Sequence, residues 1–406
     1  MLITDARAIK IMNSRNEPTI SLVLETKAGK VQASAPSGKS RGKYEAEQYS
    51  YKGIDFSITF ANAVCRRLIS QKISFNSFED LEKLEKILLE YDKTKNWHMI
   101  GGNVVFVIES AILKAMALAE GKELWKFLND RAKNIPMPVG NCIGGGQHIR
   151  KEKKSDIQEF LLIPETKNFF DSYFVNLQAY KEIKKILYEK DSVWRNELTD
   201  EKAMASSLRA ENILELLNNV SSDIKKKLGI NLRIGMDVAA SSLWNNKAYS
   251  YANPKISRSK EEQLEFMSNL IKKFNIFYIE DAFQEDDFES FAKLPKSSKC
   301  LIVGDDLTAT QPDRLKMAIE NNSINAVIVK PNQNGSLLET KKFVDLAHKN
   351  KIITIISHRS GETSDSTISD LAVAWNIPFI KVGILGKERF AKLNKLLKIE
   401  REIGRK

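Results

Sequence analysis

From about residue 230 to the end of the chain, short runs of β-branched residues alternate with amphipathic helical segments, and this alternation constrains the fold most. Each run closes on a polar residue, and these residues are Asp237, Glu280, Asp305, Lys330, His358 and Lys381. The last five are 25, 25, 28 and 23 residues apart, which is the length of one strand, one helix and two loops. Such repeats predict an α/β fold closed into a βα barrel, where the carboxyl ends of the strands surround one site. A doubly wound sheet would spread the same residues along an edge.

The first third of the chain has a different pattern. Apolar residues alternate with polar ones on both sides of Lys27 to Lys30, which predicts a β-hairpin. Helical periodicity then covers residues 57–71, 78–92 and 103–120. Strands followed by helices predict an N-terminal α+β domain over residues 1–128.

A linker and a second domain are expected to follow. The segment Ile135 to Pro138 holds two prolines, which suit neither a helix nor a central strand. We therefore interpret it as the linker into a barrel domain over residues 135–406. A total of 406 residues agrees with two domains of ordinary size.

Composition narrows the class of protein and its compartment. No apolar stretch approaches the roughly 18 to 20 residues that span a bilayer, so no membrane partner is expected. Three scattered cysteines and an N-terminus without a signal-peptide pattern predict a reducing, cytoplasmic location. The net charge is +11, which permits an anionic partner without identifying one.

Three of the strand-end residues are carboxylates: Asp237, Glu280 and Asp305. Converging carboxylates repel one another unless a cation binds them, and an all-oxygen set favours Mg²⁺ over Zn²⁺. The alternative interpretation is that each acid caps the next helix or pairs with a lysine.

The other strand ends carry cationic groups. Lys330 and Lys381 would face the same barrel mouth, where desolvation and nearby cations lower the pKa of a lysine so that it can act as a base. His358 lies in a segment with Arg359, whose guanidinium suits a phosphate or carboxylate. Together these groups favour removal of a proton next to a carboxylate, with a metal ion stabilising the enediolate.

Several segments resemble the enolase family, the phosphopyruvate hydratases of glycolysis, and the likeness runs through nearly the whole chain. The strongest match is Ser357 to Thr363 (SHRSGET), which is followed by Ile368 to Ala372. Further matches are Gly304 to Thr308, Lys392 to Asn394, Asn13 to Thr19 and Pro36 to Gly42. The resemblance implies an α+β lid domain before a TIM-like βα barrel of the enolase type whose first units are irregular.

The resemblance also implies a reaction and its residues: reversible dehydration of 2-phosphoglycerate to phosphoenolpyruvate by a lyase with two Mg²⁺ sites. Lys330 would be the base at C2, and Glu201, helped by Glu159, the acid at the C3 hydroxyl. Asp237, Glu280, Asp305 and Ser40 would be the metal ligands. The substrate would be bound by His148, Glu159, Asp305, Ser357, His358, Arg359, Ser360 and Lys381, and His358 would also serve catalysis.

The chain departs from the family pattern at several positions. Thr199-Asp200-Glu201-Lys202-Ala203 replaces a glycine-rich segment, and the stretch from His148 to Glu159 is longer and more basic than usual. Lys39 and Arg41 add charge beside Ser40. These differences leave two alternatives open: a paralogue acting on another carboxylate substrate, and a catalytically weak enolase-like binding protein. A homodimer or higher homo-oligomer is expected, and nucleic acid binding is not indicated.

Overall fold

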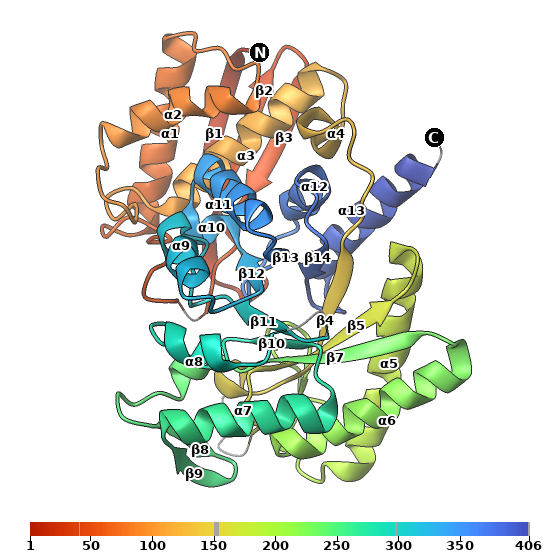
Figure 1. The fold of residues 1–406 in the computed structure, drawn as a ribbon. Helices are drawn as coiled ribbons and strands as arrows, with labels where there is room; N and C mark the ends of the chain where they lie inside the picture. The colour runs from red at the N-terminus through yellow and green to blue at the C-terminus, as the bar shows by residue number, and fades with distance from the viewer. Residues whose placement is uncertain (40, 150–153, 297–298, 405–406) are drawn as a thin grey trace.

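The computed structural model describes residues 1–39, 41–149, 154–296 and 299–404. An α+β unit occupies one end of the molecule and a barrel the other (Figure 1). The first unit holds a three-stranded antiparallel sheet: β1 (Ile3–Met12), β2 (Pro18–Thr26) and β3 (Gly29–Ser34). Its helices are α1 (Ile54–Ser70), α2 (Leu81–Leu89), α3 (Gly102–Ala119) and α4 (Leu124–Leu128). The predicted hairpin and α+β unit are confirmed.

Alternation in the hairpin decides which face of this sheet is covered. Ile20, Leu22 and Leu24 of β2 are fully buried, and Leu24 lies opposite Val31 of β3. Helix α3 packs on these two strands. It is long and apolar enough to cross a membrane by length and composition alone, yet 83% of that window is buried inside the protein. Burial against the sheet therefore accounts for the apolar composition of this helix.

Eight strands of the described chain close into a barrel. They are β4 (Met137–Gly144), β5 (Glu159–Glu165), β7 (Asn231–Asp237), β10 (Tyr278–Glu280), β11 (Leu301–Gly304), β12 (Ala326–Val329), β13 (Ile353–Ser357) and β14 (Phe379–Lys381). The helices of the barrel domain are α5 (Phe169–Lys190), α6 (Ala210–Leu228), α7 (Lys260–Phe274), α8 (Phe288–Lys293), α9 (Pro312–Glu320), α10 (Pro331–Asn334), α11 (Leu337–Lys349), α12 (Thr367–Ala374) and α13 (Lys387–Gly404). The short strands β6 (Met204–Ala205), β8 (Tyr249–Ala252) and β9 (Lys255–Arg258) lie outside the ring. The predicted barrel is confirmed.

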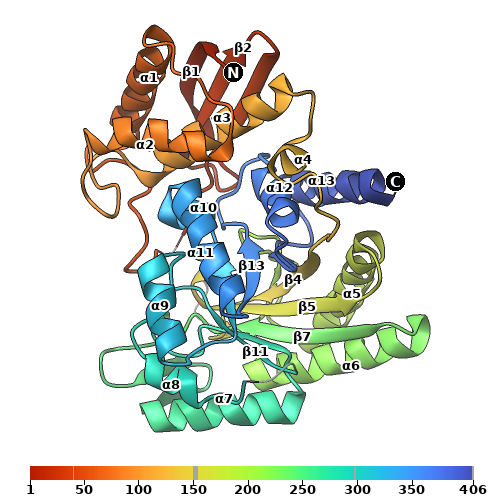
Figure 2. The ribbon, with the colours of Figure 1, turned by 45° about the horizontal axis from the view of Figure 1, so that its top comes forward.

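The first units of the barrel are irregular, as the resemblance implied. Strand β5 runs antiparallel to both β4 and β7, whereas the strands from β7 round to β14 and β4 are parallel. Figure 2 shows β5 and β7 side by side, with α5 and α6 outside them. Because β5 is reversed, its first residue, Glu159, pairs with Asp237, the last residue of β7. Both ends therefore face the barrel mouth.

The interpretation of Ile135 to Pro138 as a linker is wrong at its second half. Strand β4 begins at Met137, and Pro138 lies opposite Ile380 in the closing pair of the barrel. Met137 donates its N–H to the carbonyl of Pro378, just before β14, so the missing N–H of Pro138 points to the other side, where β5 pairs only from Gly140 onward. Proline is tolerated at this position because no hydrogen bond from a backbone N–H is needed at the start of the strand.

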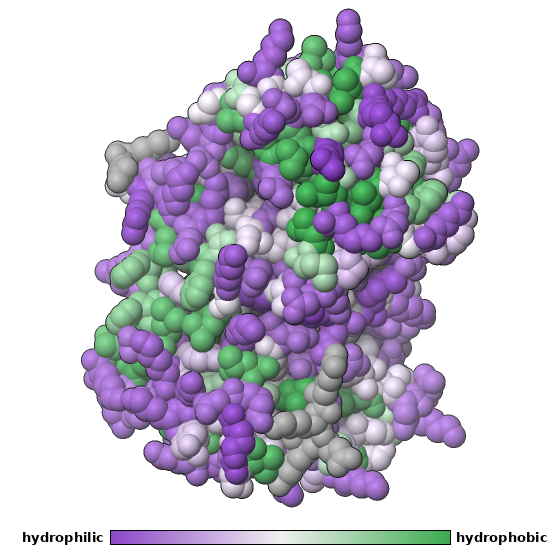
Figure 3. All heavy atoms as spheres, turned by 180° about the vertical axis from the view of Figure 1, so that it is seen from behind, coloured by the Kyte–Doolittle hydropathy of each residue, from purple (hydrophilic) through white to green (hydrophobic). Residues whose placement is uncertain are grey.

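The surface carries the excess of positive charge in a dispersed form. Hydrophilic side chains cover most of the face opposite to Figure 1, with hydrophobic patches between them (Figure 3). Many surface lysines pair with a neighbouring acid: Lys83 with Asp80, Lys122 with Glu120, Lys341 with Asp345 and Lys342 with Glu339. Such exposed pairs contribute little to stability and are ordinary surface chemistry.

Candidate active site

A small polar cavity lies at the mouth of the barrel, between the barrel and the α+β unit. The sequence-predicted residues that line it are His148, Glu159, Glu201, Asp237, Asp305, Lys330, Ser357, His358, Arg359, Ser360 and Lys381. Glu280 lies directly behind it and contacts Lys381. Ser40 is outside the described residues. The structure therefore brings together residues that the sequence separates by more than two hundred positions.

Lys381 is the centre of one cluster in this cavity. Its Nζ lies 2.8 Å from Oδ2 of Asp237 and from a carboxylate oxygen of Glu280, and 3.1 Å from Oε2 of Glu159. Burial acts to lower the pKa of Lys381, but the three carboxylates outweigh it and raise that pKa well above its ordinary value. Burial and the charge of Asp237 raise the pKa of Glu280 to about 8. The lysine partly neutralises a crowded set of acids.

Lys330 forms a second cluster with Asp305. Its Nζ donates to Oδ2 of Asp305, whose other oxygen accepts a hydrogen bond from Gln333 at 3.1 Å. Burial acts to lower the pKa of Lys330, and Asp305 reverses this and raises it to about 12. Lys330 is therefore a charged donor in this arrangement.

Glu201 is held on a buried loop. Its Oε2 lies 3.3 Å from Nε2 of His358 and accepts a hydrogen bond from Asn141 at 3.0 Å. Burial acts to raise the pKa of Glu201, but the neighbouring His358 and His148 hold it well below its ordinary value. Burial lowers the pKa of His358 in turn. The expectation that Glu201 belongs to the site agrees with this position.

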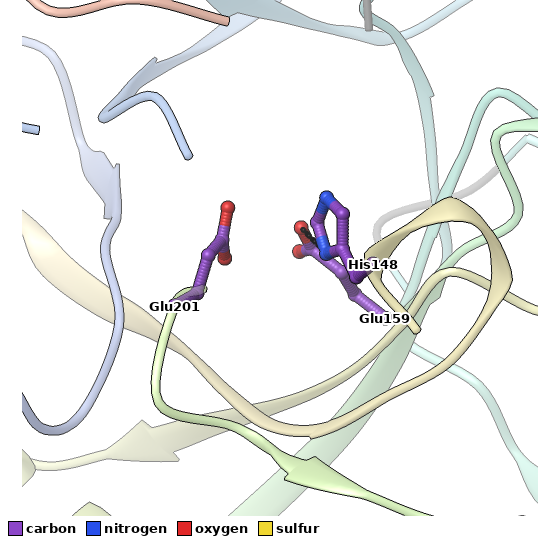
Figure 4. A group of neighbouring side chains, drawn as sticks. All are labelled: His148, Glu159 and Glu201. Atoms are coloured by element: carbon purple, nitrogen blue, oxygen red, sulfur yellow. Dashed lines mark ion pairs between the residues drawn. The ribbon is translucent and has the colours of Figure 1, made fainter. Parts of the chain in front are cut away.

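Glu159 and His148 face Glu201 across the cavity (Figure 4). The His148 Nδ1 atom is 3.9 Å from Oε1 of Glu159. Burial and the charge of Glu201 raise the pKa of Glu159 well above its ordinary value, and burial lowers that of His148. The pKa values of the two acids are therefore shifted in opposite directions, that of Glu159 upward and that of Glu201 downward.

The segment that follows β13 brings Arg359 and Ser360 to the cavity. Arg359 is buried and donates to Glu45 at 2.8 Å and to Asn332 at 3.1 Å. The Ser360 hydroxyl oxygen accepts hydrogen bonds from the backbone N–H of Lys39 and from the Arg15 guanidinium, both at 2.9 Å. Residues of the α+β unit thus orient the guanidinium and hydroxyl from the barrel side of the cavity.

The donor atoms fit a hard divalent cation in part. Within the described ranges, two groups of three ligating side chains lie within 4.8 Å of one another: His148, Glu159 and Glu201, and Asp281, Asp305 and Asp306. The trio of Asp237, Glu280 and Asp305 is not one of these groups, because Lys381 holds the first two and Lys330 holds the third. These three are still oxygen donors with raised mutual repulsion, which is the chemistry that a hard cation relieves.

Sequence reasoning missed several residues that shape the site. Asn141 and Glu45 contact Glu201 and Arg359, and Gln333 links Asp305 to Glu45. Asp281 accepts hydrogen bonds from the backbone N–H groups of Asp305 and Asp306. Asp281 directly follows Glu280 in the sequence and could have been found from that position. The side-chain amides of Asn141 and Gln333 have no comparable pattern in the sequence around them.

An α+β unit set against a βα barrel, with buried lysines and carboxylates at the strand ends, defines the class of barrel enzymes whose active site lies at the carboxyl ends of the strands. Family models agree with this class over almost all of the sequence. The model described as the enolase N-terminal domain matches residues 3–128, and the enolase C-terminal TIM barrel domain matches residues 132–406. The chain belongs to the enolase family.

Curated relatives give the same result at full length. The enolase of Methanosphaera stadtmanae is 40% identical, over 99% of this chain and 97% of the relative. The enolase of Archaeoglobus fulgidus is 39% identical, over 98% and 97%. The enolase of Picrophilus torridus is 36% identical, over 99% of both chains.

Proposed function

We propose that this protein interconverts 2-phosphoglycerate and phosphoenolpyruvate by reversible dehydration. Membership in the enolase family makes it a lyase with a phosphorylated small-molecule substrate and a metal cofactor. The observation that carries the particular reaction is the single cavity that holds Lys330 and Glu201, a base and an acid of the required kinds. No observation favours a different carboxylate substrate.

The proposed chemistry removes a proton at C2 and a hydroxyl at C3. Lys330 takes the C2 proton once Asp305 no longer keeps it charged, and the electron pair left on carbon forms the enediolate. Glu201 delivers a proton to the C3 hydroxyl, which leaves as water while the double bond forms. We propose that Glu159, whose pKa is raised, passes a proton to Glu201, whose pKa is lowered.

Binding groups surround these two residues. We propose that His148, Arg359 and Ser360 bind the phosphate and that Lys381 faces the carboxylate. Ser357 and His358 are proposed as further substrate-binding residues. Arg359 is preoriented by Glu45 and Asn332, so little side-chain freedom is lost when the anion binds.

Mg²⁺ is the proposed metal, with Asp237, Glu280 and Asp305 as ligands and Ser40 serving a second ion. A hard divalent cation there supplies positive charge that stabilises the enediolate. The oxygen-only donor set supports magnesium over zinc. Residues 1–128 and 135–406 are proposed as the two domains, in a cytoplasmic homodimer or higher oligomer.

The direct test is formation of phosphoenolpyruvate from 2-phosphoglycerate by the purified full-length protein, followed by absorbance. We expect turnover with Mg²⁺ and its loss when EDTA is added, with recovery when Mg²⁺ is restored in excess. Absence of turnover in magnesium-loaded, folded protein would contradict the proposed function. Zinc at the same free concentration serves as the comparison for metal identity.

A further inference from the structure

Lys39 contacts two separate parts of the cavity at once. It lies in the connection after β3 and lines the cavity wall. Its backbone N–H donates to the Ser360 hydroxyl at 2.9 Å, and its Nζ lies 3.3 Å from Oδ2 of Asp200. One residue of the α+β unit therefore joins the anion-binding segment to the loop that carries Glu201.

The loop around Glu201 is also held from the barrel side. The Thr199 hydroxyl oxygen accepts hydrogen bonds from the backbone N–H groups of Glu201 and Ala203. The Tyr180 hydroxyl donates a hydrogen bond to the backbone carbonyl of Lys202 at 2.8 Å. Lys202 has a φ of 64°, a left-handed conformation that costs a side-chain-bearing residue free energy. A contact from the opposite side would limit how far this strained loop can rotate.

Asp200 provides that contact. It directly precedes Glu201, and its carboxylate extends toward the α+β unit while the Glu201 carboxylate extends toward His358. The Lys39 and Asp200 side chains are 24% and 33% exposed, so the pair is partly shielded from solvent. Shielding reduces screening by salt and strengthens the attraction compared with a pair in open water.

We propose that the ion pair between Lys39 and Asp200 positions Glu201 for catalysis by fastening its loop to the α+β unit. This inference rests on the proposed function and adds a positioning residue to it. Lys39 acts through Asp200 and the loop backbone. Losing the pair slows the chemical step and leaves the bound substrate held by the other cavity groups.

Kinetics of four variants test the pair: Lys39→Met, Asp200→Asn, the double variant, and Lys39→Arg. We expect each neutral single variant to lower kcat about two- to fivefold, the range of a partly exposed ion pair, with a smaller change in KM. The double variant should be no slower than either single one, because both remove the same interaction. Lys39→Arg keeps the charge and should recover most of the loss.

Lys43→Met is the matched control. Lys43 lies in the same connection and pairs with Asp286 of the barrel at 3.2 Å, but it does not line the cavity. Its removal should leave kcat at the wild-type value. Additive losses in the double variant, or a Lys39→Met effect confined to KM, would overturn the proposal. An inactive wild-type protein would instead refute the proposed function, which separates the two failures.

Discussion

At the scale of single residues, the site depends on which partner each charged group has. Lys330 and Lys381 are both buried lysines at strand ends, yet Lys330 has one carboxylate partner and Lys381 has three. A lysine with one partner can be released by engaging that partner elsewhere. A lysine with three stays charged through the same change, which is why the base is Lys330 in the proposed mechanism.

Replacing Lys330 with methionine should remove nearly all activity. A positioned general base contributes about 10²- to 10⁴-fold to a rate, so we expect kcat to fall by that factor with KM affected less. Asp305 keeps its hydrogen bond from Gln333, so the variant should fold. Steady-state kinetics and a circular dichroism spectrum check both statements. A loss of less than tenfold would show that another group takes the proton.

At the scale of elements, the α+β unit and the barrel meet through buried polar groups. Glu109 of α3 is fully buried and accepts the backbone N–H of Leu337 at the start of α11. Burial, and after it the charge of Glu85 of α2, raises the pKa of Glu109 well above its ordinary value. Three helices from the two units therefore enclose a carboxyl group whose neutral form is favoured by its surroundings.

Replacing Glu109 with glutamine should flatten the pH dependence of stability. A glutamate whose pKa is raised in the folded state contributes its full stability below the pKa of the unfolded state. This contribution is lost as the pH rises toward the folded-state pKa, so the free energy of unfolding of the wild type falls. Glutamine stays neutral, so the stability of the variant relative to the wild type should increase as the pH rises above about 4.3, the ordinary pKa of a glutamate. Urea unfolding at several pH values measures the difference. Glu82→Gln, an exposed acid of α2, is the control, and an equal gain there would contradict the explanation.

The strand-end rule predicted part of the site from sequence alone. Glu280, Asp305, Lys330, His358 and Lys381 lie at or directly after the ends of buried strands at regular spacing, and Asp237 ends another, so their convergence follows from the barrel. Glu159, His148 and Glu201 could not be found in this way, because β5 is reversed and the other two lie on loops. Their inclusion came only from the resemblance to a known family. Pro138 was misread because a proline at the start of a strand gives the same local signal as a linker.

At the scale of the whole molecule, binding of the metal should be coupled to release of a proton from Glu280, one of the proposed metal ligands. Burial and Asp237 raise its pKa to about 8, so below that pH a cation must displace a proton. We expect apparent Mg²⁺ affinity to increase as pH rises toward 8, with proton release on binding. Calorimetric titration in two buffers of different ionisation enthalpy measures that release. Equal heats in both buffers would show that Glu280 binds without losing a proton.

The reversed direction of β5 has a consequence for protein engineering. In a uniformly parallel barrel, specificity is redesigned by randomising the connections that follow the strands. Here the connection before β5 opens at the mouth, and the turn after it lies at the far end, next to α5. A library that varies Gln158 and the residues just before it would therefore sample substrate selectivity, whereas one that varies Thr166 to Asn168 would sample only tolerance to mutation.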